Sequence, residues 1–315
     1  MQVAVLDDYQ NAALTFAPWE QLRGTTITSF AEHLATDDAV ADALASFEVI
    51  VAMRERTPFT RDRLNRLPKL RLLVTTGMAN TSIDMSACSD NGVVVAGTGV
   101  VRAATVELTW ALILSTTRHI CDEHISVREH GWQHTIGTHL DGLTLGVLGL
   151  GNIGSRVAQI GQAFGMNVLA WSENLDPERA REVGVRAATK DELLAASDVI
   201  TIHLRLSERT VGLIGAAELA RMKPTSFLVN TSRGPIIDER ALLTALATGR
   251  IAGAGLDVYD SEPLPLDHPL RSAPRVVTTP HIGYVSAQSY ERFYGDAVED
   301  IAAFIGGTPI RVLNA

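Results

Sequence analysis

A glycine pattern in the middle of the chain constrains the fold more than any other feature. Gly149, Gly151 and Gly154 have the spacing G-x-G-x-x-G, after the apolar run 143–148, which predicts a buried strand, and before 155–160, which is typical of a helix start. In that setting the first glycine permits a tight turn, the second lets the backbone approach a pyrophosphate, and the third lets the helix pack on the strand. An isolated match is compatible with an ordinary turn. The flanking runs favour a dinucleotide site in an α/β fold.

Composition and charge exclude several classes of protein. The chain has 315 residues, of which 46% are hydrophobic, and this length predicts about two domains. A net charge of −9 argues against nucleic acid as a partner, and no run is apolar enough to span a bilayer. The start at Met1 shows no signal-peptide pattern, and Cys88 and Cys121 lack the spacing of metal ligands. We therefore expect a cytoplasmic protein with two reduced thiols, no membrane association and no metal.

Short β-branched runs alternate with helical patterns along most of the chain. Near the start, strands are predicted at 3–6, 49–53, 70–75 and 93–96, and helices at 38–46, 60–66 and 83–90. A second series of strands is predicted at 143–148, 167–171, 199–204, 226–231, 254–258 and 276–279. Such alternation is typical of parallel sheets that are covered by helices on both faces. The predicted fold class is α/β, with two doubly wound parallel-sheet domains.

Two longer helical patterns flank the second series of strands. A long amphipathic helix is predicted by apolar and small residues at helical spacing, namely Val101, Ala104, Leu108, Ala111, Leu112 and Ser115. The segment 286–305 keeps the same period until Gly306. If this last helix returns to the first domain, the chain divides into residues 1–100 plus 286–315 and residues 101–285. A cleft would then separate the two domains, and ligand sites are common in such clefts.

Charged side chains follow consecutive strands of the second series. Arg233 comes after 226–231, Asp257 lies in 254–258 and is followed by Glu262, and His281 comes after 276–279. Because the carboxyl ends of parallel strands form the ligand crevice of an open α/β sheet, we expect these side chains to meet. An arginine there can bind a carboxylate through two parallel hydrogen bonds, and a histidine beside a carboxylate can deliver and recover a proton.

Each of these residues also has a purely structural interpretation. Arg233 could pair on the surface with the acidic residues at 238 and 239, and His281 could be a capped loop histidine. Glu262 could be a solvated charge, and Asp257 a helix cap or turn residue. The joint occurrence of all four behind a dinucleotide turn favours a catalytic site.

These segments resemble the D-isomer-specific 2-hydroxyacid dehydrogenase family. The resemblance rests on the glycine turn at 149–154, on the stretches 203–214, 229–239 and 255–263, and on the sequence Pro-His-Ile-Gly at 280–283. It covers most of the chain and is weakest near the N-terminus. The interval from Arg233 to Glu262 and the Pro-His-Ile-Gly segment fit the family's catalytic set, and they are more specific than the glycine turn.

The resemblance implies a Rossmann dinucleotide-binding domain, a flavodoxin-like substrate domain and hydride transfer between a nicotinamide cofactor and a small 2-oxo or D-2-hydroxy acid. The catalytic residues it implies are Arg233, which binds the substrate carboxylate, His281, the proton donor or acceptor, and its partner Glu262. Asp257 would contact the nicotinamide carboxamide. The implied cofactor-binding residues are Gly149, Gly151, Asn152, Ile153, Gly154, Ser172, Glu173, His203, Leu204, Thr231, Ser232, Asp257 and Gly283.

Substrate binding is expected at two places besides Arg233 and His281. The resemblance places the backbone of Gly77, Met78 and Ala79 against the substrate carboxylate. Arg54 and Arg56, after the strand 49–53, could add positive charge for a second acidic group on the substrate, although a solvated loop is the favoured interpretation of these two residues.

The chain departs from the family's pattern where the strand 167–171 ends. Ser172 stands where NAD-dependent members usually have an acidic residue, which opens the site to NADP. Glu173 is adjacent, however, and no Lys or Arg follows until Arg179. NAD is therefore the predicted cofactor, with NADP as the alternative. Arg205 stands where the family commonly has proline, so the choice of substrate stays open.

Five histidines between residues 119 and 139 surround the exit of the predicted interdomain helix. His130 and His134 have i,i+4 spacing but no third ligand, so we expect no metal site. Trp132 and the nearby helix are expected to contribute to a homodimer interface.

An alternative function on the same fold is a dinucleotide-sensing regulatory protein without significant turnover. Retention of Arg233, Glu262 and His281 disfavours it, because sensing needs no proton donor.

Overall fold

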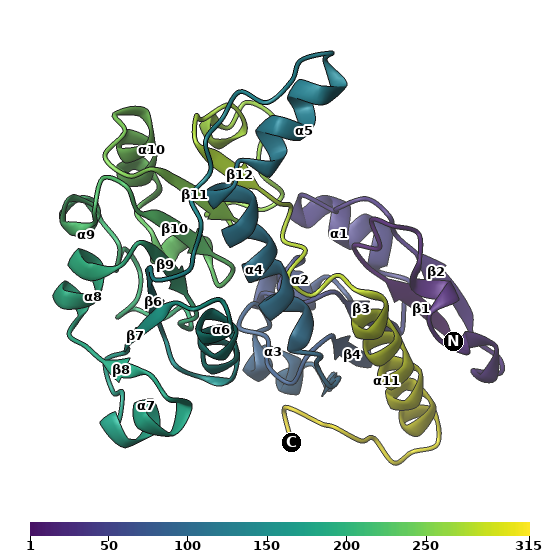
Figure 1. Cartoon of the computed structure of the whole chain (residues 1–315). Coiled ribbons are helices and arrows are strands. Elements are labelled where there is room, and N and C mark those ends of the chain that lie inside the picture. The colour runs from purple at the N-terminus through teal and green to yellow at the C-terminus, as the bar shows by residue number, and fades with distance from the viewer. The chain divides into compact units, whose positions relative to one another are not determined.

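The computed structural model describes all residues from Met1 to Ala315. The chain divides into two compact units, one formed by Met1–Val101 with Val285–Ala315 and the other by Arg102–Tyr284 (Figure 1). None of the helices combines the length and the apolar character needed to cross a membrane.

The first unit contains a five-stranded parallel sheet in the order β2-β1-β3-β4-β5. This order is that of flavodoxin-like folds. The strands are almost entirely buried except for the edge strand β2, which fits a parallel sheet covered on both faces. Their bounds are β1 Gln2–Val5, β2 Thr26–Ser29, β3 Val49–Ala52, β4 Leu72–Thr75 and β5 Val94–Gly97.

The helices of the first unit begin at polar caps. The side chains of Thr36, Thr60 and Asp84 each accept a hydrogen bond from the backbone of the first helical turn, which satisfies an otherwise unpaired amide. The helix α11 packs against β4 and β5. The bounds are η1 Ala13–Thr15, η2 Trp19–Gln21, α1 Asp37–Leu44, α2 Arg61–Asn65, α3 Met85–Asp90 and α11 Ala287–Ile305.

The second unit contains a seven-stranded parallel sheet in the order β12-β11-β10-β9-β6-β7-β8. Counted from β6, the order is that of a Rossmann sheet with an additional strand at one edge, and the strand order reverses between β6 and β9. The bounds are β6 Thr144–Leu148, β7 Asn167–Trp171, β8 Arg186–Ala187, β9 Val199–Ile202, β10 Phe227–Asn230, β11 Gly253–Leu256 and β12 Val276–Thr278.

Helices cover both faces of the seven-stranded sheet (Figure 1). The apolar cluster on one face includes residues of α8, α9 and α10, and the cluster on the other face includes residues of α4, α6 and α7. The bounds are α4 Ala103–Thr117, α5 Ile120–Arg128, α6 Asn152–Ala163, α7 Pro177–Val183, α8 Lys190–Ala196, α9 Ala216–Arg221, η3 Gly234–Ile236, α10 Glu239–Ala247 and η4 Pro269–Arg271.

The two parallel sheets with helices confirm the predicted α/β fold class. Two strands escaped prediction, because β2 is a partly exposed edge and β8 has only two residues. The predicted apolar stripe of the interdomain helix is wrong in part. Ala111 is exposed, whereas Thr109 and Thr117 are buried. Their burial leaves no hydroxyl unsatisfied, because the two hydroxyls donate to the carbonyls of Thr105 and Ile113, both 2.8 Å away.

Candidate active site

The three glycines of the turn after β6 meet three different steric demands. Gly149 has a φ of +101°, and a Cβ there would lie 2.5 Å from the carbonyl oxygen of His203. A Cβ at Gly154 would lie 1.9 Å from the carbonyl oxygen of Gly149, so α6 packs on the turn only without a side chain. Gly151, the N-cap of α6, has open space and no side-chain cap. The turn therefore presents helix amides to open space, which fits the pyrophosphate of a dinucleotide.

Replacing Gly154 with alanine is expected to raise the Kd of NADH at least about tenfold, because the turn must shift to admit the Cβ. Fluorescence titration with NADH measures this. G295A is the matched control, since Gly295 lies inside α11 with nothing within 4 Å of its added Cβ. Unchanged NADH affinity in G154A would contradict the assignment of the turn.

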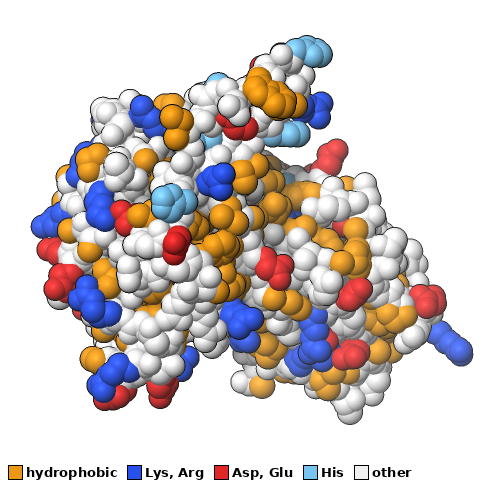
Figure 2. Space-filling model, in the orientation of Figure 1, with side chains coloured by type: hydrophobic (Ala, Val, Ile, Leu, Met, Phe, Trp, Pro, Cys, Tyr) orange, Lys and Arg blue, Asp and Glu red, His pale blue; other side chains and the backbone are white.

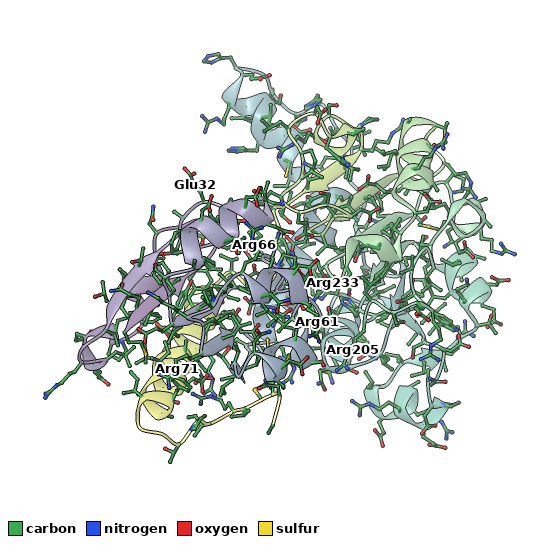
Figure 3. The ribbon with its side chains drawn as sticks, turned by 180° about the vertical axis from the view of Figure 1, so that it is seen from behind. Glu32, Arg61, Arg66, Arg71, Arg205 and Arg233 are labelled. Carbon is green, nitrogen blue, oxygen red and sulfur yellow. The ribbon has the colours of Figure 1, made fainter.

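Arg233 follows the carboxyl end of β10, and Arg205 follows that of the neighbouring strand β9 (Figure 3). The segment that carries Arg233 is fixed by its neighbours. The Asn230 side chain donates to the carbonyl of Arg233 at 2.9 Å, and the Ser232 hydroxyl donates to the carbonyl of Ile202 at 2.8 Å. Arg233 is partly exposed, and its Nη1 donates to the carbonyl of Ser232 at 2.7 Å. A cation is thus held at the carboxyl edge of the sheet.

His281 and Glu262 form a close pair at the carboxyl ends of β11 and β12. His281 Nδ1 lies 2.5 Å from Glu262 Oε2, and both side chains are partly exposed. Burial acts to raise the pKa of Glu262, but the hydrogen bond and charge of His281, the amide of Tyr259 and the charge of Arg233 outweigh it, so the pKa is lowered. The carboxylate is therefore ionised at neutral pH and can orient an imidazolium.

The His281 ring has a second contact, and its backbone has an unusual conformation. The ring packs edge to face with Tyr284, with centroids 5.4 Å apart and planes at 71°. The backbone of His281 has a φ of +53°, in the left-handed region that costs free energy for residues other than glycine. Such a conformation persists only where surrounding contacts determine it.

Asp257 supplies several of those contacts. Its carboxylate is fully buried and accepts hydrogen bonds from the Thr279 hydroxyl at 2.6 Å and from the amides of Ile282 and Gly283, both at 2.8 Å. Burial is the main cause that raises the pKa of Asp257, and these hydrogen bonds and the charge of His281 oppose it. The structure thus ties Asp257 to the loop that carries His281. Its expected contact with the nicotinamide stays a prediction.

Other expected cofactor-binding residues also lie at strand ends of the second unit. His203 and Leu204 follow β9, and His203 Nε2 lies 3.0 Å from the Thr201 hydroxyl. Burial of the ring lowers the pKa of His203 to about 3, so it stays neutral, although the residue as a whole keeps partial exposure. Thr231 is buried, with its hydroxyl 2.9 Å from that of Thr109. Ser172 and Glu173 follow β7, and Asn152 and Ile153 begin α6.

The remaining expected substrate-binding residues belong to the first unit. Arg54 follows β3, has a φ of +53°, and donates from Nη1 to the carbonyl of Thr76 at 2.9 Å. Gly77 follows β4 with a φ of +119°, and Met78 and Ala79 beside it are exposed. All lie at the carboxyl edge of the five-stranded sheet. Their contact with substrate stays a prediction.

Comparison with known proteins identifies the family. The family model for the D-isomer specific 2-hydroxyacid dehydrogenase, NAD binding domain, matches residues 110–283. The chain is 40% identical over 264 residues to a glyoxylate reductase of Aeropyrum pernix, covering 80% of this chain and 79% of that protein. It is 38% identical over 272 residues to a D-3-phosphoglycerate dehydrogenase of Bacillus subtilis, covering 85% of this chain but 51% of that protein. The chain thus spans about half the length of that relative.

Solved structures give the same result. A phosphoglycerate oxidoreductase from Vibrio cholerae has a TM-score of 0.93 at 38% identity, with 98% of this chain and 100% of that chain covered. A D-lactate dehydrogenase from Aquifex aeolicus, complexed with NAD and lactic acid, has a TM-score of 0.79 at 28% identity, with 97% and 96% covered. NAD is accordingly the cofactor indicated for the second unit. The chain belongs to the D-isomer specific 2-hydroxyacid dehydrogenase family.

Proposed function

We propose that the protein is an NAD-dependent D-2-hydroxyacid dehydrogenase that reduces a small 2-oxo acid at neutral pH. The observation that carries the proposal is the 2.5 Å contact between His281 Nδ1 and Glu262 Oε2 beside the strand end that bears Arg233. A proton donor that is oriented by an ionised carboxylate, next to a cation, suits reduction of a carbonyl beside a carboxylate. The first unit would be the substrate domain and the second the NAD-binding domain.

Each of the three site residues has its own role in the reaction. When bound, NADH would supply the hydride for the carbonyl carbon, and the products would be the D-2-hydroxy acid and NAD⁺. Arg233 binds the substrate carboxylate and stabilises the negative charge that grows on the carbonyl oxygen. His281 donates its proton to that oxygen, and Glu262 orients the ring through Nδ1. In oxidation the same groups act in reverse, with His281 as the base.

We propose NAD rather than NADP because no cation is available where β7 ends. Ser172 and Glu173 occupy this position, and Glu173 adds a negative charge that disfavours a 2′-phosphate. In the adjacent helix α7, Arg179 pairs with Glu182 at 3.0 Å and Arg181 pairs with Glu178. The expected ratio of kcat/KM for NADH to that for NADPH is at least about tenfold, which corresponds to one charge interaction of roughly 1.4 kcal/mol. Equal kcat/KM values for NADH and NADPH would overturn the proposal of NAD.

Absorbance of reduced nicotinamide tests the reaction directly. Wild-type protein is assayed with NADH and a series of 2-oxo acids that includes glyoxylate, pyruvate, hydroxypyruvate and bulkier analogues, and the chirality of each product is determined. The proposal requires NADH consumption with at least one small 2-oxo acid and formation of the D-isomer. Binding of NADH without turnover of any 2-oxo acid would favour the sensing alternative.

We propose that the protein is a homodimer that associates through the segment 120–136. The helix α5 has no buried residue, and Figure 2 shows hydrophobic and histidine side chains gathered on it. Trp132 is 75% exposed and Ile136 is 94% exposed. Large apolar side chains that lie this close together and this exposed are unusual on the surface of a monomer. Sedimentation equilibrium should give a dimer for the wild type and a larger monomer fraction for W132S/I136S. A monomeric wild type would contradict the proposal.

We also propose a cytoplasmic location. Cys88 and Cys121 are both free thiols, which fits a reducing compartment. Recovery of the native protein in the cytosolic fraction of its source cells would agree with this, and recovery with a membrane or secreted fraction would contradict it.

A further inference from the structure

One tyrosine forms hydrogen bonds with Glu262 and with the segment that carries His281. The backbone amide of Tyr259 donates to Glu262 Oε1 at 2.9 Å, while Oε2 of the same carboxylate faces His281. The phenol of Tyr259 donates to the carbonyl oxygen of Thr279 at 2.9 Å. Tyr259 therefore lies between the loop that carries the carboxylate and the segment that carries the histidine.

The turn that contains His281 begins at the Thr279 carbonyl. It accepts the amide of His281 at 3.0 Å as well as the Tyr259 phenol. The Thr279 amide donates to the carbonyl of Leu256 at 2.8 Å, just beyond the last paired residues of β11 and β12. Because His281 has a left-handed backbone, its ring position depends on how firmly this carbonyl is held.

The Tyr259 phenol is suited to such a structural role. The side chain is 7% exposed and belongs to the apolar cluster on one face of the seven-stranded sheet. Burial, with the charges of Asp257 and Glu262, holds the pKa of Tyr259 well above its usual range, so the phenol keeps its proton and remains a donor.

We propose that Tyr259 is a positioning residue, whose phenol and backbone amide together set the distance and orientation of the His281–Glu262 pair. This inference rests on the proposed function of that pair. It assigns no contact between Tyr259 and the substrate, so its effect is expected in kcat and in the pH profile rather than in KM.

Y259F tests the inference with little structural disturbance, because it removes only the phenol oxygen and keeps the ring and the backbone amide. We expect kcat to fall about tenfold and KM for NADH and the 2-oxo acid to change by less than about twofold. A looser pair also relieves the depressed pKa of Glu262, so the acid limb of the kcat profile moves to higher pH.

S226A is the matched control. Ser226 is also buried, and its hydroxyl donates to a backbone carbonyl, that of Lys223, at 2.7 Å, but it lies at the amino end of β10, opposite the edge that bears Arg233. Both variants should show a similar loss of thermal stability. Only Y259F should change kcat and the pH profile.

A second measurement separates this inference from the proposed function. The ¹⁵N imidazole signal of His281, assigned by its loss in H281A, is followed by NMR as a function of pH without substrate. The inference requires a changed titration in Y259F and an unchanged one in S226A, whether or not the wild type reduces any 2-oxo acid. It is overturned if Y259F titrates as the wild type does, or if the two variants change alike. Wild-type turnover and its loss in H281A test the proposed function independently.

Discussion

Replacement of His281 with alanine is expected to lower kcat for 2-oxo acid reduction by about 10²–10⁴-fold, the usual contribution of a positioned general acid. The substrate oxygen then has only water as a proton source, and Glu262 has lost the group that it orients. The Kd of NADH should change by less than about twofold, because the glycine turn follows β6 and not β12. Stopped-flow kinetics and fluorescence titration measure the two quantities.

H268A is a suitable control for this substitution. His268 also pairs with a glutamate, Glu239, at 3.0 Å, but that pair joins the start of α10 to the loop before η4. Its kcat should stay close to that of the wild type. Wild-type turnover in H281A would remove this histidine from the mechanism.

Replacement of Arg233 with lysine is expected to lower kcat/KM by roughly 10–150-fold. Lysine keeps the charge but loses the planar fork that binds a carboxylate through two hydrogen bonds, and one charge-assisted bond is worth about 1.5–3 kcal/mol. KM for the 2-oxo acid should rise and kcat should fall, since the same cation faces the ground-state carboxylate and the developing oxyanion. Steady-state kinetics at varied 2-oxo acid measure both.

R221K provides the comparison for that variant. Arg221 ends α9 and lies 3.3 Å from Asp191 in a largely exposed ion pair, so its replacement should have little effect on either constant. If R233K has the kinetics of R221K, Arg233 does not bind the substrate.

The fold followed from the sequence where strands are buried on both faces. Runs such as 49–53 and 199–204 are nearly continuous in β-branched and apolar residues, and β3 and β9 lie within them. The prediction failed at the sheet edges, where β2 is partly exposed and β8 is short. It also misplaced the buried stripe of α4, because Thr109 and Thr117 are buried with their hydroxyls satisfied inside the helix.

The site followed in part from one topological rule, that polar residues after parallel strands gather at the same edge. The rule predicted that Glu262 and His281 lie close together, and their side chains are 2.5 Å apart. It gave no indication that Asp257 bonds to the loop of His281, or that the Tyr259 phenol reaches Thr279, because both contacts depend on the irregular backbone after β11 and β12. The left-handed backbone of His281 was equally unpredictable, since only tertiary contacts maintain it.

A crystal structure of the protein with NADH and oxamate, a 2-oxo acid analogue that is not reduced, would show directly whether Arg233 and His281 face the same substrate. We expect the oxamate carboxylate on the Arg233 guanidinium and the oxamate carbonyl oxygen within about 3.2 Å of His281 Nε2, with Nδ1 still on Glu262. An oxamate bound away from both Arg233 and His281, with NADH in place at the glycine turn, would contradict this expectation.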